Sequence, residues 1–116
     1  MAFTDDEVLR FGEQIEKLFW SKHRPPLHLR DKVREGHRVE KSEIVLFFVR
    51  PHFRDSTQEV YEQIAKTRFV RSRNVWQVYW WRADGKWHLY PPRPEVKSLQ
   101  AFLKLVSEDA NCCFFG

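Results

Sequence analysis

Three absences narrow what this sequence of 116 residues can be. It has only two cysteines, Cys112 and Cys113, and adjacent cysteines cannot form a disulfide framework. We therefore expect a reducing, cytoplasmic setting, in which the pair acts as two small hydrophobic side chains. No run approaches the ~20 apolar residues of a membrane span, and the acidic, amphipathic beginning does not resemble a signal peptide. We expect no membrane partner.

Metal-binding and catalytic spacings are also missing. The sequence has no HxH, HxxxH or CxxC pattern, so we predict neither a metal site nor a cofactor. A small enzyme would have to use His88, Lys66 and Arg50. A lone histidine in a strand is more often a hydrogen-bonded structural residue, and the sequence places no histidine base beside the cysteines. An enzyme is therefore the third of our three functional hypotheses.

Positive charge and large aromatic residues are concentrated in one part of the chain. Residues 63–93 hold four of the five tryptophans and seven basic residues against one acid, Asp84. The whole chain has a formal net charge of +4, so this segment carries +6 and the remainder −2. The length and the 42% hydrophobic content are typical of one globular domain, residues 1–116. The basic segment allows an acidic partner such as nucleic acid.

β-branched and aromatic residues between turn signals predict three strands in this segment, at residues 63–71, 74–83 and 86–90. Asp84-Gly85 predicts a two-residue hairpin loop, because glycine tolerates the positive φ that such a loop needs. That loop would give four cross-strand pairs: Arg82 with Trp87, Trp81 with His88, Trp80 with Leu89, and Tyr79 with Tyr90.

A turn at Ser72-Arg73 would pair the first two of these strands, with Phe69 opposite Trp76 and Lys66 opposite Tyr79. Side chains alternate along a strand, so the two registers sort the residues onto two faces. The predicted core face collects Ala65, Thr67, Phe69, Trp76, Val78, Trp80 and Leu89, with Arg82 and Trp87 at its rim. The predicted binding face mixes cations with flat aromatics: Lys66, Arg68, Gln77, Tyr79, Trp81, His88 and Tyr90.

The segment before these strands predicts one helix and one hairpin. Thr4 and Glu7 predict a capping box at the start of the helix, and the residue before Pro25-Pro26 ends it. One apolar stripe follows the helical spacing: Val8, Phe11, Ile15, Leu18 and Phe19. Residues 36–40 and 43–50 then predict a hairpin, whose second strand is apolar on both faces, as in a strand that is covered on both sides.

A second helix is predicted near the C-terminal end. Ser98 can cap it, and its apolar residues repeat at i, i+3, i+4 and i+7: Leu99, Phe102, Leu103 and Val106. The order helix, five strands, helix predicts an α+β fold, an antiparallel meander of about five strands with an N-terminal and a C-terminal helix. The apolar tail at residues 112–116 is expected to pack against the rest.

Separated blocks of the sequence resemble a known family. They are Arg24-Pro25-Pro26 with Arg30-Asp31, Leu46-Phe47 with Val49-Arg50-Pro51, Ala65-Lys66, Val75-Trp76, Tyr79-Trp80, Arg82-Ala83-Asp84, Lys86-Trp87-His88 with Tyr90, and Cys113-Phe114-Phe115-Gly116. The chain resembles domain-of-unknown-function family 3024, small bacterial proteins, over nearly its whole length. Where that family often has an acid, this chain has Phe48. The resemblance implies a self-contained bacterial domain and no particular activity.

Two binding hypotheses are open for the predicted binding face. Nucleic acid is the first, because bases stack on aromatic rings for about 1–3 kcal/mol each and cations neutralise phosphates. A homodimeric protein-interaction module without catalytic activity is the second, because Tyr, Trp and Arg are enriched at interface hot spots. Salt discriminates the two, since phosphate binding weakens steeply with ionic strength. A third possibility also stays open, in which the residues of the predicted binding face have a purely structural role and are covered by a loop, a helix or a second subunit.

Overall fold

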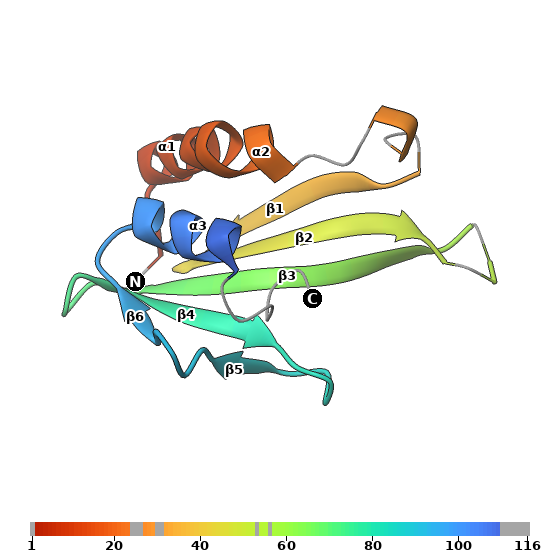
Figure 1. Ribbon diagram of the computed structural model, residues 1–116. Coiled ribbons are helices and arrows are strands. Elements are labelled where there is room, and N and C mark those ends of the chain that lie inside the picture. The colour runs from red at the N-terminus through yellow and green to blue at the C-terminus, as the bar shows by residue number, and fades with distance from the viewer. Residues whose placement is uncertain (1, 24–26, 30–31, 53, 56, 110–116) are drawn as a thin grey trace.

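The computed structural model describes residues 2–23, 27–29, 32–52, 54–55 and 57–109, and it shows one sheet with helices on one side (Figure 1). The strands are β1 (Arg34–Glu40), β2 (Glu43–Pro51), β3 (Glu59–Val70), β4 (Val75–Trp81), β5 (Trp87–Leu89) and β6 (Glu95–Val96). The helical segments are α1 (Asp5–Ile15), a π-helical turn (Glu16–Trp20), α2 (Ser21–His23), a 3₁₀ turn (Leu27–Leu29) and α3 (Leu99–Glu108).

The strands follow one another as an antiparallel meander in the order β1-β2-β3-β4-β5. β6 pairs with the same edge of β4 as β5 does, next to the start of β4. The predicted α+β fold with an N-terminal and a C-terminal helix is therefore confirmed. β6 was not predicted, because two residues after a proline-rich loop carry no strand pattern of their own.

The N-terminal helix begins as predicted. The Glu7 N–H donates to Thr4 Oγ1 at 3.2 Å and the Thr4 N–H donates to Glu7 Oε1 at 2.9 Å, which completes the capping box. The Glu7 carboxylate also accepts a hydrogen bond from Arg71, 64 residues later in the chain. The Arg71 guanidinium, together with Thr4, holds the pKa of Glu7 below its usual range. This ion pair ties the start of α1 to the turn between β3 and β4.

The buried side of the first helix differs from the predicted stripe at both ends. Val8 is 37% exposed. The Phe3 ring packs on the Phe11 ring instead, with 4.9 Å between the ring centres. At the other end Phe19 and Trp20 are both fully buried. The π-helical turn inserts an extra residue and so rotates the chain that follows it. The stripe predicted with a period of 3.6 residues therefore does not include Trp20.

The pairing of β3 with β4 is the predicted one, with Phe69 opposite Trp76 and Lys66 opposite Tyr79. The side of the sheet that faces the helices contains the core residues of the strands: Ile44, Leu46, Ala65, Thr67, Trp76 and Val78. The predicted apolar residues of α3 are all buried against this layer: Leu99, Phe102, Leu103 and Val106. The cysteine pair and the tail at residues 110–116 lie outside the described residues.

The strand β2 is apolar on both faces for a local reason. Phe47 and Val49 point away from the helices, yet they are only 8% and 5% exposed. The Phe47 ring lies against Gly36 on β1, and the Tyr61 ring meets it edge-on at 5.3 Å. Neighbouring strands therefore shield Phe47, and its burial does not require another layer of structure.

Two glycines should respond in opposite ways to alanine. A Cβ at Gly36 would lie 2.6 Å from the Phe47 ring, so Gly36→Ala should destabilise the protein by about 1–3 kcal/mol through overpacking. A Cβ at Gly12 would meet its nearest neighbour, His37 Nε2, at an ordinary 3.8 Å. Gly12→Ala should therefore stabilise α1 by up to about 1 kcal/mol. Urea unfolding of both variants checks this, and equal shifts of one sign would contradict it.

His37 predicts how stability depends on pH. Trp20 Nε1 donates to His37 Nδ1 at 3.3 Å, which requires Nδ1 to be unprotonated. Burial lowers the pKa of His37, and nearby Glu16 opposes that shift in part. As the pH falls below about 6.5, the unfolded chain binds its proton first. Stability should therefore decrease from that pH down toward the lower pKa of the folded state.

A substitution tests the assignment to this histidine. His37→Gln keeps an acceptor for Trp20 but cannot be protonated. The urea midpoint of the variant should consequently fall less than that of the wild type when the pH is lowered from about 7 to about 5. An equal fall in both proteins would show that other groups produce the pH dependence.

Candidate binding face of the sheet

The candidate site is the face of the sheet that points away from α1, α2 and α3, and we call it the open face. In Figure 1 these helices lie above the sheet, and no described element covers the other side. Strand register places on it, among others, Arg38, Glu43, Val45, Tyr61, Gln63, Lys66, Arg68, Gln77, Tyr79, Trp81, Trp87 and Leu89. The open face is thus built by strands β1 to β5.

Five of the seven predicted binding residues lie on the open face: Lys66, Arg68, Gln77, Tyr79 and Trp81. The prediction is wrong for His88 and Tyr90. His88 pairs with Trp80 and so shares the helix side of the sheet, and Tyr90 is a core residue, 1% exposed. Trp87 and Leu89, which were predicted on the core face, lie on the open face instead, opposite Trp81 and Tyr79.

The length of the turn between β4 and β5 explains this error. The Gly85 N–H donates to the Arg82 carbonyl at 2.9 Å, and the Arg82 N–H donates to the Lys86 carbonyl at 3.1 Å. The loop therefore has three residues, Ala83, Asp84 and Gly85, with a positive φ of 75° only at the glycine. A three-residue hairpin loop commonly combines a type I turn with such a left-handed residue. One extra loop residue shifts the register by one and exchanges the faces of β5.

Substitutions in this turn should test the left-handed conformation of Gly85. Gly85→Val forces a β-branched residue into the left-handed region and should cost about 1–3 kcal/mol, whereas Gly85→Asn should cost less, since asparagine tolerates that region. Ala83→Val is the matched control and should be nearly neutral, because Ala83 is exposed and has a negative φ. Thermal unfolding measures all three, and a loss for Gly85→Val no larger than that for Ala83→Val would contradict the left-handed conformation of Gly85.

Lys66 is the most buried cation of the open face. Its ammonium lies 4.7 Å from the centre of the Tyr79 ring and 5.7 Å from that of Trp87. Glu43 Oε1 is 3.8 Å from the same nitrogen, and the Lys66 side chain is only 16% exposed. Cation–π contacts are worth about 0.5–1 kcal/mol at exposed sites and more when desolvated. Lys66 is therefore already engaged within the protein.

Charges of the two signs are balanced on the open face. Strand register and ion pairing place four cations and four carboxylates on it: Arg34, Arg38, Lys66 and Arg68, with Glu40, Glu43, Glu59 and Glu95. Arg34 pairs with Glu59 and Lys66 with Glu43, while Glu95 pairs with Arg73 of the neighbouring turn. Among the described residues, Arg38 and Arg68 form no ion pair. The predicted basic face is thus largely neutralised.

The sequence pattern could not show this balance. Arg38 and Glu40 are two residues apart on β1, so the sequence of that strand by itself indicates that they share a face. Seven residues, 52–58, separate β2 from β3, and β3 also contains a bulge opposite the Leu46–Phe47 step. Because of these two features, the sequence does not show which residues of β1 and β2 share a face with which residues of β3.

A recess of about 190 Å³ lies near the middle of the open face. It is lined by residues of four strands: Arg38, Glu40, Glu43, Val45, Gln63, Lys66 and Trp87. The Trp87 side chain on β5 thus shares a recess with residues of β1, which indicates that the sheet curls around this face. Gln63 Oε1 is buried and has no hydrogen-bond donor within the described part of the chain.

Exposed apolar side chains lie on the same face as the recess. Tyr61 is 51% exposed, Trp81 38% and Leu89 45%. The Trp81 ring meets Trp87 edge-on at 5.1 Å, so the two indoles form one aromatic surface. Large apolar groups left in water on an uncovered sheet are typical of a surface that binds something.

Comparison with known proteins adds the family. A profile of the domain of unknown function DUF3024 matches residues 5–116. The chain belongs to the DUF3024 family. A search of curated proteins and a search of solved structures each found no match. The resemblance seen in the sequence blocks is confirmed, and membership of DUF3024 assigns no activity.

The groups considered for catalysis are not brought together in this DUF3024 protein. Lys66 lies on the open face, whereas Arg50 and His88 lie on the helix side, where Arg50 pairs with Glu62. His88 Nε2 is 2.7 Å from Asp84 Oδ2 in the turn, and this contact lowers the pKa of Asp84. The described residues include no group of three side chains able to hold a metal ion, and none of their helices is long and apolar enough to cross a membrane.

Proposed function

We propose that the open face is a protein-interaction surface on which two copies of this chain pair, without catalytic activity. The observation that carries the proposal is the combination of exposed aromatic and aliphatic groups with a balance of charges. Tyr61, Trp81 and Leu89 supply the apolar part, and strand register places all three on the open face.

The charge balance supports a second copy as the partner. In a two-fold symmetric interface the same surface meets itself, so a surface with one sign of charge repels its copy. The open face carries both signs, and Arg38 and Arg68 have no carboxylate partner among the described residues. Glu40 on β1 is likewise without an ion pair there. A two-fold axis can therefore bring a free cation of one copy toward a free carboxylate of the other.

The composition of the face supports the same partner. Two sheets that pack face to face bury the side chains of their inner faces in a layer about 10 Å thick. Trp, Tyr and Arg dominate the energy of such interfaces, and Trp81, Tyr61 and Arg68 are all at least partly exposed on the open face. Pairing would remove these apolar groups from water without adding new structure.

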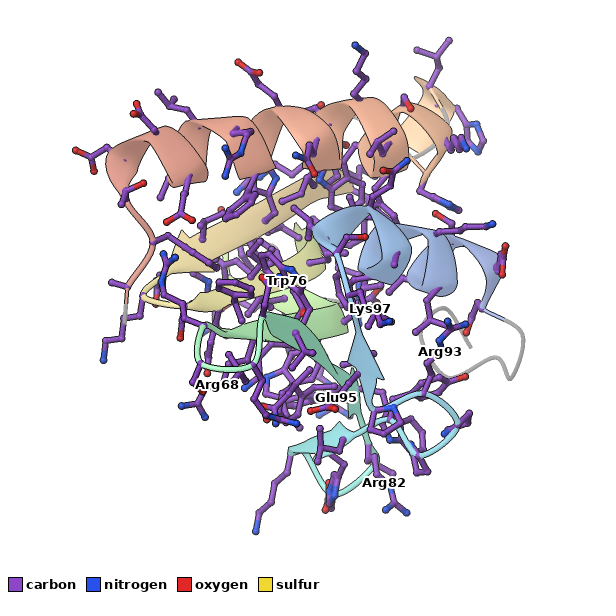
Figure 2. All side chains as sticks on the ribbon, turned by 90° about the vertical axis from the view of Figure 1, so that its left-hand side faces the viewer. Arg68, Trp76, Arg82, Arg93, Glu95 and Lys97 are labelled. Carbon is purple, nitrogen blue, oxygen red and sulfur yellow. The ribbon has the colours of Figure 1, made fainter. Side chains whose placement is uncertain are left out.

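Nucleic acid is the second candidate, favoured by one observation. The Trp81–Trp87 pair offers exposed ring surface on which bases can stack, and Arg38 and Arg68 have no described carboxylate partner that would compete with phosphates. In Figure 2 the side chain of Arg68 extends away from the helices. This candidate ranks second because Lys66, predicted as a phosphate contact, is already paired with Glu43.

Sedimentation equilibrium tests the proposal. The wild type should be a dimer that persists at high salt, because apolar burial is not screened. Trp81→Ala should raise the dissociation constant about a thousandfold, since loss of a hot-spot aromatic costs about 2 kcal/mol or more and a two-fold interface contains the residue twice. Leu9→Ser, on the outer side of α1 where Leu9 is 69% exposed, is the control and should leave the dimer intact.

Three outcomes decide between the candidates. A wild type that remains monomeric throughout the measurable concentration range overturns the dimer. Equal weakening by Trp81→Ala and Leu9→Ser overturns the assignment to the open face. Binding of a single-stranded oligonucleotide that falls steeply with salt, and that Arg68→Gln weakens, would favour nucleic acid instead.

A further inference from the structure

The strand β1 is one edge of the sheet, because β2 is its only neighbour among the described strands (Figure 1). Hydrogen bonds on the other side of β2 show which groups of β1 point outward. The Phe69 N–H on β3 donates to the Ser42 carbonyl at 2.8 Å. Backbone groups alternate in direction along a strand, so the even-numbered residues at this end of β2 bond β3 and the odd-numbered ones bond β1.

His37 and Val39 therefore direct their backbone N–H and C=O groups away from the sheet. Val45, one of the odd-numbered residues of β2, is opposite Arg38. Arg38 and the other even-numbered residues of β1 thus bond β2, and the residues between them point outward. Within the described ranges, neither His37 nor Val39 has a backbone–backbone hydrogen bond outside the β1–β2 ladder. Such a row of donors and acceptors is a template for another strand.

Several devices that protect edge strands are missing from β1. Proteins block an edge with proline, lysine, a β-bulge or a very short strand. The strand β1 has seven residues, REGHRVE, with neither proline nor lysine, and its register with β2 is continuous. The backbone at His37 and Val39 is consequently able to pair with a further strand.

A groove of about 580 Å³ lies beside this edge. Apart from His37, its lining comes from α1 and the π-helical turn: Val8, Leu9, Gly12, Glu13, Glu16 and Lys17. His37 pairs with Leu46, a core residue, so the groove is on the helix side of the sheet. A strand added to β1 would direct every second side chain to this side, and those side chains would enter the groove.

The two ends of the groove differ in chemistry. Val8 and Leu9 are 37% and 69% exposed, which leaves their aliphatic groups available to an added side chain. Glu13, further along α1, is exposed and forms no ion pair within the described part of the chain. The carboxylates of Glu13 and Glu16 outnumber the ammonium of Lys17, so the lining is negatively charged. The groove therefore suits an apolar side chain next to a basic one.

We infer that β1 binds an extended peptide segment of another protein as an additional antiparallel strand. Backbone hydrogen bonds to His37 and Val39 hold this strand at the edge. One apolar side chain lies against Val8 and Leu9, and a basic side chain two residues away reaches Glu13. In this mode of recognition the main chain provides affinity, and the alternate side chains provide specificity.

A second copy of this chain fits the same edge less well. In the longest antiparallel register of β1 with a second β1, Arg34 is opposite Glu40 and His37 is opposite His37. The second strand would then bring Glu35, His37 and Val39 to the helix side, and only the valine is apolar. Its glutamate would also meet a negatively charged groove. The groove does not overlap the open face, so peptide binding does not depend on dimerisation.

The experiment is a titration of ¹⁵N-labelled protein with the acetylated and amidated peptide TKTVTKT. Threonine favours strands, and the alternation places valine between two lysines on one side of the peptide. The backbone N–H resonances of His37 and Val39 should shift in a saturable way, and their hydrogen exchange should slow, because both groups gain acceptors. The Arg38 N–H, which already bonds β2, should respond less.

Modified peptides test the backbone pairing and the charge. In an antiparallel pair, the valine opposite an outward-pointing residue of β1 directs its own N–H to β1. N-methylation of the valine should therefore weaken binding at least about tenfold, whereas N-methylation of the two flanking threonines should change it less than about twofold. The peptide TETVTET should bind at least about fivefold more weakly than TKTVTKT, because like charges repel.

Two leucine variants separate this site from the proposed dimer interface. Leu9→Ser removes part of the apolar end of the groove and should weaken TKTVTKT about fivefold, with the dimer intact. Leu89→Ser is the matched control on the open face, and it should weaken the dimer but leave the peptide affinity unchanged. The two side chains are 69% and 45% exposed, so both variants should keep the fold, which the rest of the spectrum verifies.

Five results would overturn the inference. The first is the absence of a saturable shift at His37 and Val39. The second is equal weakening by the two patterns of N-methylation, which would exclude strand pairing. Equal affinity for TKTVTKT and TETVTET removes the basic side chain, and equal effects of Leu9→Ser and Leu89→Ser remove the groove. Finally, protection of the His37 and Val39 amides that rises with protein concentration, without peptide, would show that two copies pair at this edge instead.

Discussion

The alternation of side chains along a strand is the constraint on which this structure depends most. Each hairpin loop transmits that alternation to the next strand, so the number of residues in a loop decides which side chains meet the helices. Between β4 and β5, the left-handed Gly85 closes a loop of three residues. Trp87 and Leu89 are consequently on the open face, and Tyr90 is in the core.

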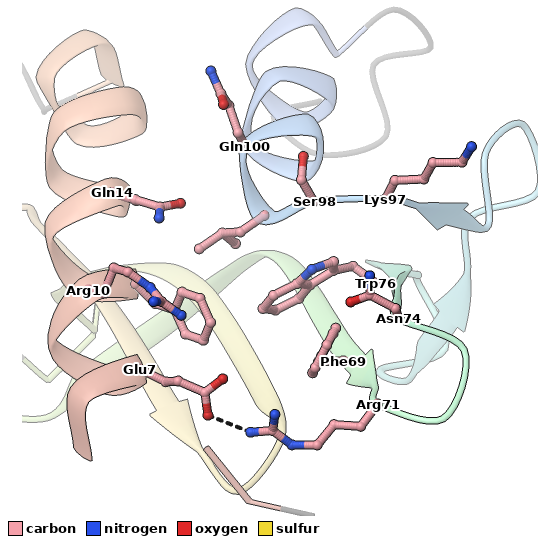
Figure 3. A pocket seen from close by; sticks show the side chains of 12 residues that line it. Glu7, Arg10, Gln14, Phe69, Arg71, Asn74, Trp76, Lys97, Ser98 and Gln100 are labelled. Atoms are coloured by element: carbon pink, nitrogen blue, oxygen red, sulfur yellow. Dashed lines mark hydrogen bonds and ion pairs between the residues drawn. The ribbon is translucent and has the colours of Figure 1, made fainter. Parts of the chain in front are cut away.

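The helices are attached to the other side of the same sheet by a small number of specific contacts. The Glu7–Arg71 ion pair joins the start of α1 to the β3–β4 turn. The Trp20–His37 hydrogen bond joins the π-helical turn to β1. The Phe3 ring lies 4.9 Å from the Phe11 ring and 5.8 Å from the Trp76 ring. An aromatic pocket beside Trp76 exists because α1 and α3 reach this end of the sheet from different directions (Figure 3).

The open face shows why a basic sequence segment need not form a basic surface. Residues 63–93 carry a net charge of +6, but β1, β2 and β6 bring carboxylates to the same face. Glu43 pairs with Lys66, and Glu95 pairs with Arg73. The remaining apolar and aromatic groups then decide which partner the face suits, and a surface of balanced charge suits a second copy better than a polyanion.

Features that depend on neighbouring residues could be predicted from the sequence: the capping box at Thr4, the stripe of α3 and the β3–β4 register across its turn. The fold class followed from the order of these elements. The faces of β5 could not be predicted, because loops of two and of three residues both accept Asp84-Gly85.

Other features exist only in the tertiary structure. The hydrogen bond of Trp20 with His37, the ion pair of Lys66 with Glu43 and the pocket beside Trp76 join segments far apart in the sequence. Local patterns carry no information on such contacts. They are selected by the packing of the helices on a curled sheet, where each large side chain takes the space that the others leave.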